Sequence, residues 1–286
     1  MSTTPLLPVD SLAGVRLGIS VSESTDLARL GLLETHLRLA LGELTRTVLL
    51  TGGSLLYGGR LAPDGYATFV ATELHRHTRR DRPLELCLAW HEHRRMTLSD
   101  LERFRQELGL VGRLVCLDPN GVPIAPADGR GEPPEPVTEP RDRHRALTGL
   151  RHFMRDRQHG RVFVGGRRYG FEGSTPGLME ESLVALRAGQ PIYLAGGFGG
   201  VTSDIARLLG VDDGDWLPPD PREPSPEPGF LAGCDLLREL TSAPGWSGLA
   251  NGLSDEENGW LAVTHRPSDI ATLVGLGLGR LNSAAG

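Results

Sequence analysis

Glycine pairs recur directly after short apolar runs of this 286-residue chain. Gly52-Gly53 follows VLL, Gly165-Gly166 follows VFV, and Gly196-Gly197 follows IYLA and continues into Gly199-Gly200. Glycine lets backbone N–H groups approach phosphate, and the carboxyl ends of parallel strands form the crevice where such ligands bind. The three pairs together predict a nucleotide-type pocket. None forms GxGxxG with an acid about 20 residues later, which disfavours a standard dinucleotide dehydrogenase.

Charged residues surround the second glycine pair. We expect Pro176-Gly177 to begin a helix whose N-terminal N–H groups hold a phosphate, with Arg167 and Arg168 forking onto it. Glu180 lies one turn into that helix, where its carboxylate can accept hydrogen bonds from ribose hydroxyls. In an N-glycosidase the same group would stabilise the ribosyl cation or orient water. Alternatively, Glu180 and Glu181 only complement the helix dipole.

Further polar residues follow other predicted strands. Ser20, Ser22 and Glu23 either contact the ligand or cap the next helix. The sequence His91-Glu92-His93 is not HExxH and has no third ligand evident nearby, so we expect a surface turn and no metal. We also expect no cofactor.

All 30 basic residues are arginine. The absence of lysine excludes a Walker A phosphate site, a Schiff-base enzyme and a kinase of the usual kind. The net charge of −6 argues against nucleic acid as the partner, because counterion release needs a basic surface. A small anionic, nucleotide-type ligand fits this composition better.

The composition, 39% hydrophobic and 23% charged, is typical of globular proteins with a sizeable core. No apolar run approaches the roughly 18 to 20 residues that span a bilayer, and the N-terminus lacks the features of a signal peptide. We therefore expect a cytoplasmic protein without a membrane partner. Cys87 and Cys116 lie in apolar strand-like runs, so we expect buried thiols rather than a disulfide or zinc site.

Short apolar runs alternate with longer amphipathic stretches, which indicates a Rossmann-like α/β sandwich with a mostly parallel sheet of six or seven strands. Strands are expected at 15–21, 47–51, 84–90, 112–118, 161–164 and 191–195. Helices are expected at 30–45, 66–79, from 97 or 99 onward, and at 141–158, 177–188 and 202–209.

Two segments rich in proline and acid interrupt this pattern. Residues 119–140 should form an exposed, mobile loop, and residues 212–228 should link a first domain, 1–211, to a C-terminal extension, 212–286. The extension contains predicted helices near 230–240 and 267–281, which are too small for their own core. We expect them to cover the sheet or an interface of a homo-oligomer.

Two stretches resemble the SLOG superfamily of Rossmann-like domains, which includes the LONELY GUY phosphoribohydrolases, the DNA-processing DprA proteins and sensor domains of anti-phage systems. VLLTGGSLLYGG, ending in Gly58-Gly59, resembles the family's strand and glycine loop. LRHFMRDRQHGRVFVGG, followed by STPGLMEESLVAL, resembles the phosphoribohydrolase segment with a catalytic arginine and glutamate. The resemblance covers roughly residues 14 to 210.

Position by position, the resemblance places Arg151 on or next to the catalytic arginine and Glu180 on the glutamate. The family's PGG-x-GT loop is interrupted, because Arg167 to Thr175 separates Gly165-Gly166 from Pro176-Gly177. The chain is most similar to the branch of predicted nucleotide sensors in bacterial conflict systems. That implies binding of an ADP-ribose-like or other NAD-derived ligand; the alternative is base–ribose hydrolysis by Glu180 and Arg151.

The inserted segment Arg167–Thr175 combines two arginines, an aromatic pair at Tyr169 and Phe171, and glycines. These residues offer anion donors, stacking surfaces and hinges, so we predict that the segment closes over the ligand. The alternative is an ordinary surface loop whose arginines pair with acids elsewhere.

Overall fold

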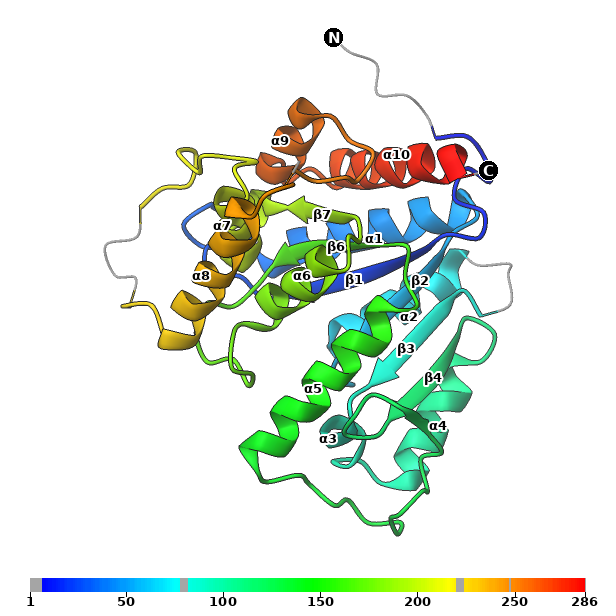
Figure 1. The fold of residues 1–286 in the computed structure, drawn as a ribbon. Helices are drawn as coiled ribbons and strands as arrows, with labels where there is room; N and C mark the ends of the chain where they lie inside the picture. The colour runs from blue at the N-terminus through cyan, green and yellow to red at the C-terminus, as the bar shows by residue number, and fades with distance from the viewer. Residues whose placement is uncertain (1–6, 78–81, 220–223, 247, 286) are drawn as a thin grey trace.

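The protein is described by a computed structural model that covers residues 7–77, 82–219, 224–246 and 248–285 (Figure 1). A seven-stranded sheet with the order β5-β4-β3-β2-β1-β6-β7 forms its centre, and only the short edge strand β5 is antiparallel. The strands are β1 Arg16–Ser22, β2 Ser54–Gly58, β3 Leu84–Leu88, β4 Gly112–Leu117, β5 Pro123–Ile124, β6 Gly160–Gly165 and β7 Ile192–Ala195. The predicted α/β class and mostly parallel sheet are confirmed.

The strand order reverses direction at β1. From β1 the chain moves outward through β2, β3 and β4, and then returns to add β6 and β7 on the other side of β1. In open α/β sheets such a reversal separates the loops on either side and leaves a crevice at the carboxyl ends of the strands. The topology therefore places the carboxyl ends of β1, β2 and β6 around the expected ligand position.

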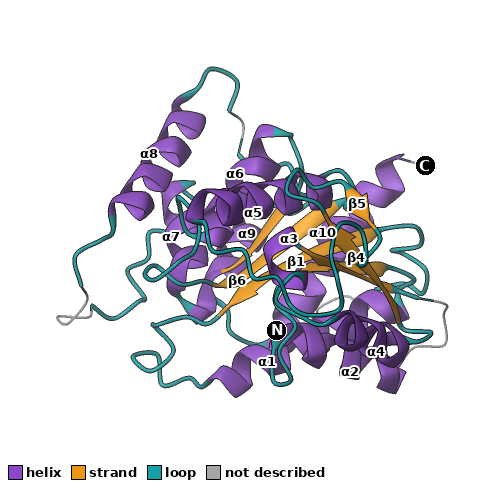
Figure 2. Cartoon of the chain, turned by 90° about the horizontal axis from the view of Figure 1, so that it is seen from below, coloured by secondary structure: helices purple, strands orange, loops and turns teal. Residues whose placement is uncertain are grey.

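Helices cover both faces of the sheet (Figure 2). α1, α2, α4 and α10 pack on one face, and α5, α6 and α7 pack on the other, with α8 lying outside α6 and α7. Their bounds are α1 Glu34–Leu50, α2 Tyr66–His77, α3 Trp90–His93, α4 Leu98–Leu108, α5 Pro140–Arg155, α6 Gly177–Arg187, α7 Gly200–Leu208, α8 Pro228–Ser242, α9 Asp255–Val263 and α10 Pro267–Ala285, with a 3₁₀ turn, η1, at Gly196–Phe198.

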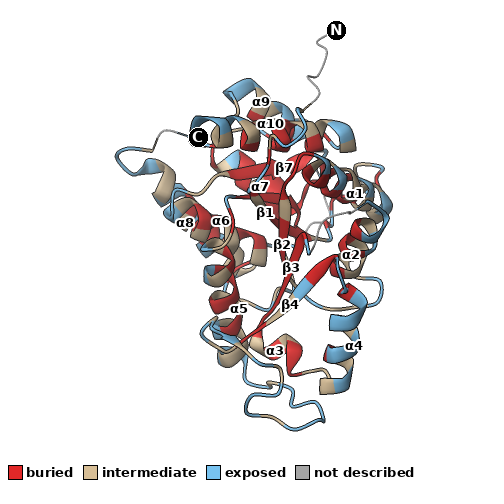
Figure 3. Cartoon of the chain, turned by 90° about the vertical axis from the view of Figure 1, so that its right-hand side faces the viewer, coloured by how far each residue is buried: buried red, intermediate tan, exposed pale blue. Residues whose placement is uncertain are grey.

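The central strands are buried on both faces, as Figure 3 shows. All five residues of β3 and all six of β6 are buried. Continuous apolar runs of this kind are typical of parallel strands covered by helices on both sides. The predicted burial of Cys87 and Cys116 is confirmed.

The predicted strand at 47–51 is wrong, because these residues mostly belong to the last turn of α1. Leu37, Leu41, Leu44 and Val48 are all buried and recur at helical spacing, so the apolar face continues through VLL. The true second strand, β2, begins only after Gly52-Gly53.

Of the two C-terminal helices that the sequence predicted, α10 shares the core beside the sheet, whereas α8 packs outside α6 and α7. α10 packs along α1 and α9 lies against β7, so both share the core formed by the N-terminal elements (Figure 1). The sequence analysis missed α9. No helix in the described part of the chain is both long and apolar enough to cross a bilayer.

Both proline-rich segments are largely exposed where they are described. Within 119–140, β5 pairs with its neighbour β4. Arg94 donates a hydrogen bond to the carbonyl oxygen of Gly129, and Arg130 donates one to the carbonyl oxygen of Met96. The mobility of 119–140 stays a prediction. Part of the 212–228 linker and the predicted end of the second helix at Arg79 lie outside the described residues.

Candidate functional site

A cavity of about 460 Å³ opens at the carboxyl ends of β1, β2 and β6. Its size lies within the range of small-molecule sites, and it lies beside the reversal in strand order. Of the residues predicted to bind ligand, the following line it: Ser22, Glu23, Gly58, Gly59, Arg167 and Gly177. Three different loops thus bring them together, and their binding role stays a prediction.

The N-terminus of α6 faces this cavity. Pro176 occupies the N-cap position, and no side chain of the described residues caps the helix there. Gly177 and Leu178, in the first turn, line the cavity. The first N–H groups of a helix have no intrahelical partner, and the helix dipole favours an anion beside them. The first turn of α6 is therefore suited to hold a phosphate.

Three arginines stand around the cavity, each paired with an acid. Arg38 lies 2.8 Å from Glu34, and Arg60 lies 3.1 Å from Glu172. Arg167, about half exposed, lies 2.5 Å from Glu23 across the rim. Ion pairs of exposed side chains are weak, so a phosphate can compete for these guanidinium groups.

Aromatic side chains form another part of the cavity wall: Tyr57, Tyr66 and Phe171. The hydroxyl of Tyr66 is buried and lies beside the carboxylate of Glu34. Burial, together with the nearby Glu34 carboxylate, raises the pKa of Tyr66, so its hydroxyl remains a proton donor at neutral pH. A ligand in the cavity could accept a hydrogen bond from this hydroxyl.

Arg151 and Glu180 are brought together, as the resemblance implied. Arg151 Nη1 lies 2.5 Å from Glu180 Oε2, and the hydroxyl of Thr148 donates to Glu180 Oε1 at 2.7 Å. Arg151 is only 4% exposed, so it does not lie on a solvated helix face. Neither residue is among those that line the cavity, although an added Cβ at Gly177 would meet Arg151 at 3.2 Å. The pair thus lies just behind the first turn of α6.

Glu181 joins a second buried network beneath the cavity floor. The hydroxyl of Ser20 donates to Glu181, and Arg161 Nη1 lies 3.0 Å from Glu181 Oε2. Arg161 is fully buried, and burial lowers its pKa while Glu181 opposes that shift. These contacts account for both Ser20 and Glu181 without a ligand.

Gly165 and Gly166 form the turn after β6 and serve close backbone packing. Both have positive φ, +69° and +108°. A Cβ at Gly165 would lie 2.4 Å from the carbonyl oxygen of Ser22, and the N–H of Gly166 donates to that same oxygen. Only glycine permits this approach. The pair therefore fixes the end of β6 against β1 rather than facing the cavity.

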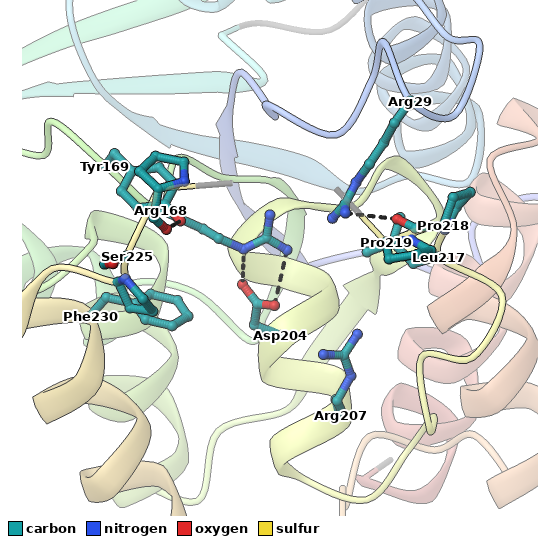
Figure 4. Close-up of a pocket in the computed structure, with 12 residues that line it drawn as sticks. Arg29, Arg168, Tyr169, Asp204, Arg207, Leu217, Pro218, Pro219, Ser225 and Phe230 are labelled. Carbon is teal, nitrogen blue, oxygen red and sulfur yellow. Dashed lines mark hydrogen bonds and ion pairs between the residues drawn. The ribbon is translucent and has the colours of Figure 1, made fainter. Parts of the chain in front are cut away.

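Arg168 is buried in an ion network, and its role as a phosphate ligand stays a prediction. It contacts Asp26 at 2.9 Å and Asp204 at 2.6 Å. A second cavity of about 520 Å³ borders this network (Figure 4). There two guanidinium nitrogens of Arg168 donate hydrogen bonds to the two carboxylate oxygens of Asp204, while Arg29 donates one to the carbonyl oxygen of Pro218. Because two carboxylates occupy its guanidinium, Arg168 holds the fold together.

The turn Gly196 to Gly200 packs closely against other backbone segments, and its role as a ligand loop stays a prediction. A Cβ at Gly196 would lie 2.4 Å from the carbonyl oxygen of Ala262, and one at Gly197 would lie 2.2 Å from that of Thr264. Gly199 and Gly200 meet Asp26, whose carboxylate accepts from the N–H of Gly200 at 2.6 Å. Asp26 thus occupies the N-terminus of α7, where an external anion would otherwise bind.

Gly52 and Gly53 lie before β2 rather than after a strand. They connect the end of α1 to the amino end of β2, at the edge of the sheet opposite the cavity. Their predicted place in the ligand pocket is therefore wrong. Gly52 has φ +89°, and a Cβ at Gly53 would meet Val48, so a tight turn explains both glycines.

The predicted surface turn at His91-Glu92-His93 is also wrong. These residues belong to the short helix α3, and both histidines are fully buried. The loop after β6 supplies the third group that the sequence did not reveal. His91, Glu92 and Glu172 offer atoms that lie within 4.8 Å of one another, a spacing that could hold a metal ion. Arg60 and Arg95 contact the same two carboxylates.

Sequence reasoning missed Arg38, Arg60 and Tyr66 as cavity residues. Arg60 directly follows Gly58-Gly59, and correct placement of β2 would have put it at a strand's carboxyl end. Arg38 lies one turn after Glu34 at the start of α1, and its guanidinium stacks 5.2 Å from the centre of the Tyr66 ring. No sequence signal joins these two residues, because their contact forms between separate helices.

The comparisons with known proteins agree with this architecture. A search of curated proteins finds no significant match. The sequence profile of the family described as SLOG cluster2 matches residues 11–261, which include every strand, the loop after β6 and most of α9. Such a match implies a nucleotide-related function on a Rossmann-like fold. The chain therefore belongs to the SLOG superfamily, in its cluster2 family.

Proposed function

We propose that the protein binds a nucleotide or NAD-derived ligand, such as ADP-ribose, in the cavity at the carboxyl ends of β1, β2 and β6. It would act as a ligand sensor in a bacterial anti-phage or conflict system. The observation that carries the ligand class is the uncapped N-terminus of α6, which opens into this cavity at the reversal of strand order. The role as a sensor rests on the resemblance to the conflict-system branch.

Each part of such a ligand has a counterpart in the cavity wall. A phosphate would rest on the first turn of α6, at Gly177 and Leu178, where the helix dipole favours a negative charge. Arg60 and Arg167 on the rim can add charge-assisted hydrogen bonds. The ring and hydroxyl of Tyr66 offer a stacking surface and a donor for a base or ribose.

The arrangement of Arg151 and Glu180 favours a sensor over a hydrolase. Their side chains pair with each other at 2.5 Å, and Thr148 occupies the second oxygen of Glu180. The charge of a carboxylate held in this way is balanced by the arginine, and the group has little freedom to orient water or to contact a ribosyl cation. Binding without turnover is the outcome that this geometry supports.

Thermal-shift and calorimetric titrations with AMP, ADP, NAD, ADP-ribose and cyclic ADP-ribose test the proposal. A ligand at 100 times its dissociation constant adds about 2.7 kcal/mol of apparent stability. Arg60→Gln should weaken binding by about 1.5 to 3 kcal/mol, the value of a charge-assisted hydrogen bond. Arg105→Gln is the matched control, since Arg105 is exposed and paired within α4. If no compound on this panel binds, the proposal is wrong.

The alternative is an N-glycosidase that cleaves a base–ribose bond. It is favoured by one observation: the arginine and glutamate of the family's catalytic segment, Arg151 and Glu180, do meet beside the first turn of α6. In that case the wild-type protein would release free base from AMP or NAD, detected by chromatography. Glu180→Gln would abolish release while sparing binding. A sensor binds the same compounds and releases no base.

A further inference from the structure

We infer that Arg60, Arg95 and His91 form an anion site at the edge of the cavity, and that Glu172 now occupies it as a stand-in for an anionic group of the ligand. This inference deepens the proposed function and rests on it: the ligand would carry two separated anionic groups, one at α6 and one here. The three residues follow the carboxyl ends of β2 and β3, whereas Glu172 comes from the loop after β6.

The carboxylate of Glu172 is surrounded by donors. Arg60 Nη2 lies 3.1 Å away, His91 Nε2 3.7 Å and Arg95 Nη2 3.8 Å. Glu172 itself is 38% exposed and lines the cavity together with Arg60. A half-exposed carboxylate on a loop is held weakly, so a phosphate with more charge and more acceptor oxygens can replace it.

His91 gives a further indication that this cluster can bind a ligand. Its side chain is fully buried, and Nδ1 makes no hydrogen bond within the described part of the chain. Its Nε2 faces the carboxylates, 3.2 Å from Glu92 and 3.7 Å from Glu172. An imidazole Nε2 that faces carboxylates at this spacing can donate equally to an oxygen of an anionic ligand.

The charge balance favours an anion over a metal ion. Arg60 and Arg95 each contact both Glu92 and Glu172, so two guanidinium groups already balance two carboxylates. A divalent cation would add two positive charges beside the guanidinium groups of these two arginines. When Glu172 leaves, Glu92 alone opposes the arginines, and the site becomes positive. A phosphate restores the balance, whereas a metal ion increases the repulsion.

The loop carrying Glu172 bridges the rim of the cavity. Arg167 at its start pairs with Glu23 beyond β1, and Glu172 pairs with Arg60 beyond β2. A ligand that displaces Glu172 therefore releases one end of this bridge. We expect the loop to change its contacts when the second anionic group binds.

The test compares Glu172→Gln with the wild type in titrations of inorganic pyrophosphate and of ADP-ribose. Removal of the competing carboxylate should tighten binding of pyrophosphate by about three- to tenfold. Arg60→Gln should weaken it by about tenfold or more. Glu102→Gln removes the same charge from an exposed helix pair and should leave both affinities unchanged. Circular dichroism verifies that each variant is folded.

The outcomes separate the two claims. If Glu172→Gln tightens pyrophosphate but no nucleotide binds, the anion site stands and the proposed function fails. If ADP-ribose binds, but Glu172→Gln changes the affinity for neither pyrophosphate nor ADP-ribose, the proposed function stands and the anion site is refuted. Calorimetric titration with Mn²⁺ and with Zn²⁺ tests whether the cluster binds a metal ion instead. Metal binding that Glu172→Gln weakens would identify the cluster as a cation site and overturn the inference.

Discussion

Replacement of Arg168 by methionine is expected to lower the free energy of unfolding by about 3 to 5 kcal/mol at pH 7. Arg168 is 5% exposed and is held between Asp26, at 2.9 Å, and Asp204, at 2.6 Å. Methionine keeps much of the volume but removes the charge. Asp204 then loses its ion-pair partner, while Asp26 keeps Arg29, at 2.7 Å, and the uncompensated burial of Asp204 produces most of the loss.

The loss should depend on pH in a defined direction. Burial raises the pKa of Asp204, while the hydrogen bond and charge of Arg168 oppose that rise. Without Arg168 the pKa of Asp204 should rise further. A carboxyl with a raised pKa in the folded state holds its proton more tightly there than in the unfolded chain. Stability is then lost as the pH rises from the unfolded pKa, near 3.9, through the folded one.

Acidification should therefore bring the variant closer to the wild type. Urea unfolding followed by circular dichroism at pH 7 and pH 5 measures both free energies. Arg105→Met is the matched control, because Arg105 is exposed and should change stability by no more than about 0.5 kcal/mol. A loss below about 1 kcal/mol at pH 7, or a loss that is equal at both pH values, would refute this reasoning and leave Arg168 available to a ligand.

Three further predictions concern packing, capping and thiol reactivity. Gly197→Ala should destabilise the protein by about 1 to 3 kcal/mol in urea unfolding, since its Cβ would lie 2.2 Å from a carbonyl oxygen, whereas the exposed Gly131→Ala should not. Ser254→Ala removes the N-cap of α9 and should reduce stability by about 1 kcal/mol in the same assay. Burial raises the pKa of Cys116 to about 12 and also raises that of Cys87, so both should react with a thiol reagent only after unfolding; rapid reaction of the native protein would contradict their burial.

Local patterns of the chain predicted much of the fold. Apolar runs such as LELCL and VFV predicted buried parallel strands because both faces of such strands are covered. The TVLLT run at 47–51 misled because its β-branched threonines and valine favour a strand, while its register continues the buried face of α1. Packing against the sheet overrides local propensity there, and that error moved Gly52-Gly53 to the wrong end of a strand.

The sequence alone determined the fold class and the mostly parallel sheet, because these depend on hydrophobic period. Only the tertiary structure decided which charged side chains face the cavity. Arg167 and Arg168 are neighbours in sequence, yet one lines the cavity rim and the other is buried between Asp26 and Asp204. Likewise, only the folded chain brings Glu172 to His91. Such ion pairs join residues far apart in the chain, and no local pattern encodes which partner each charge meets.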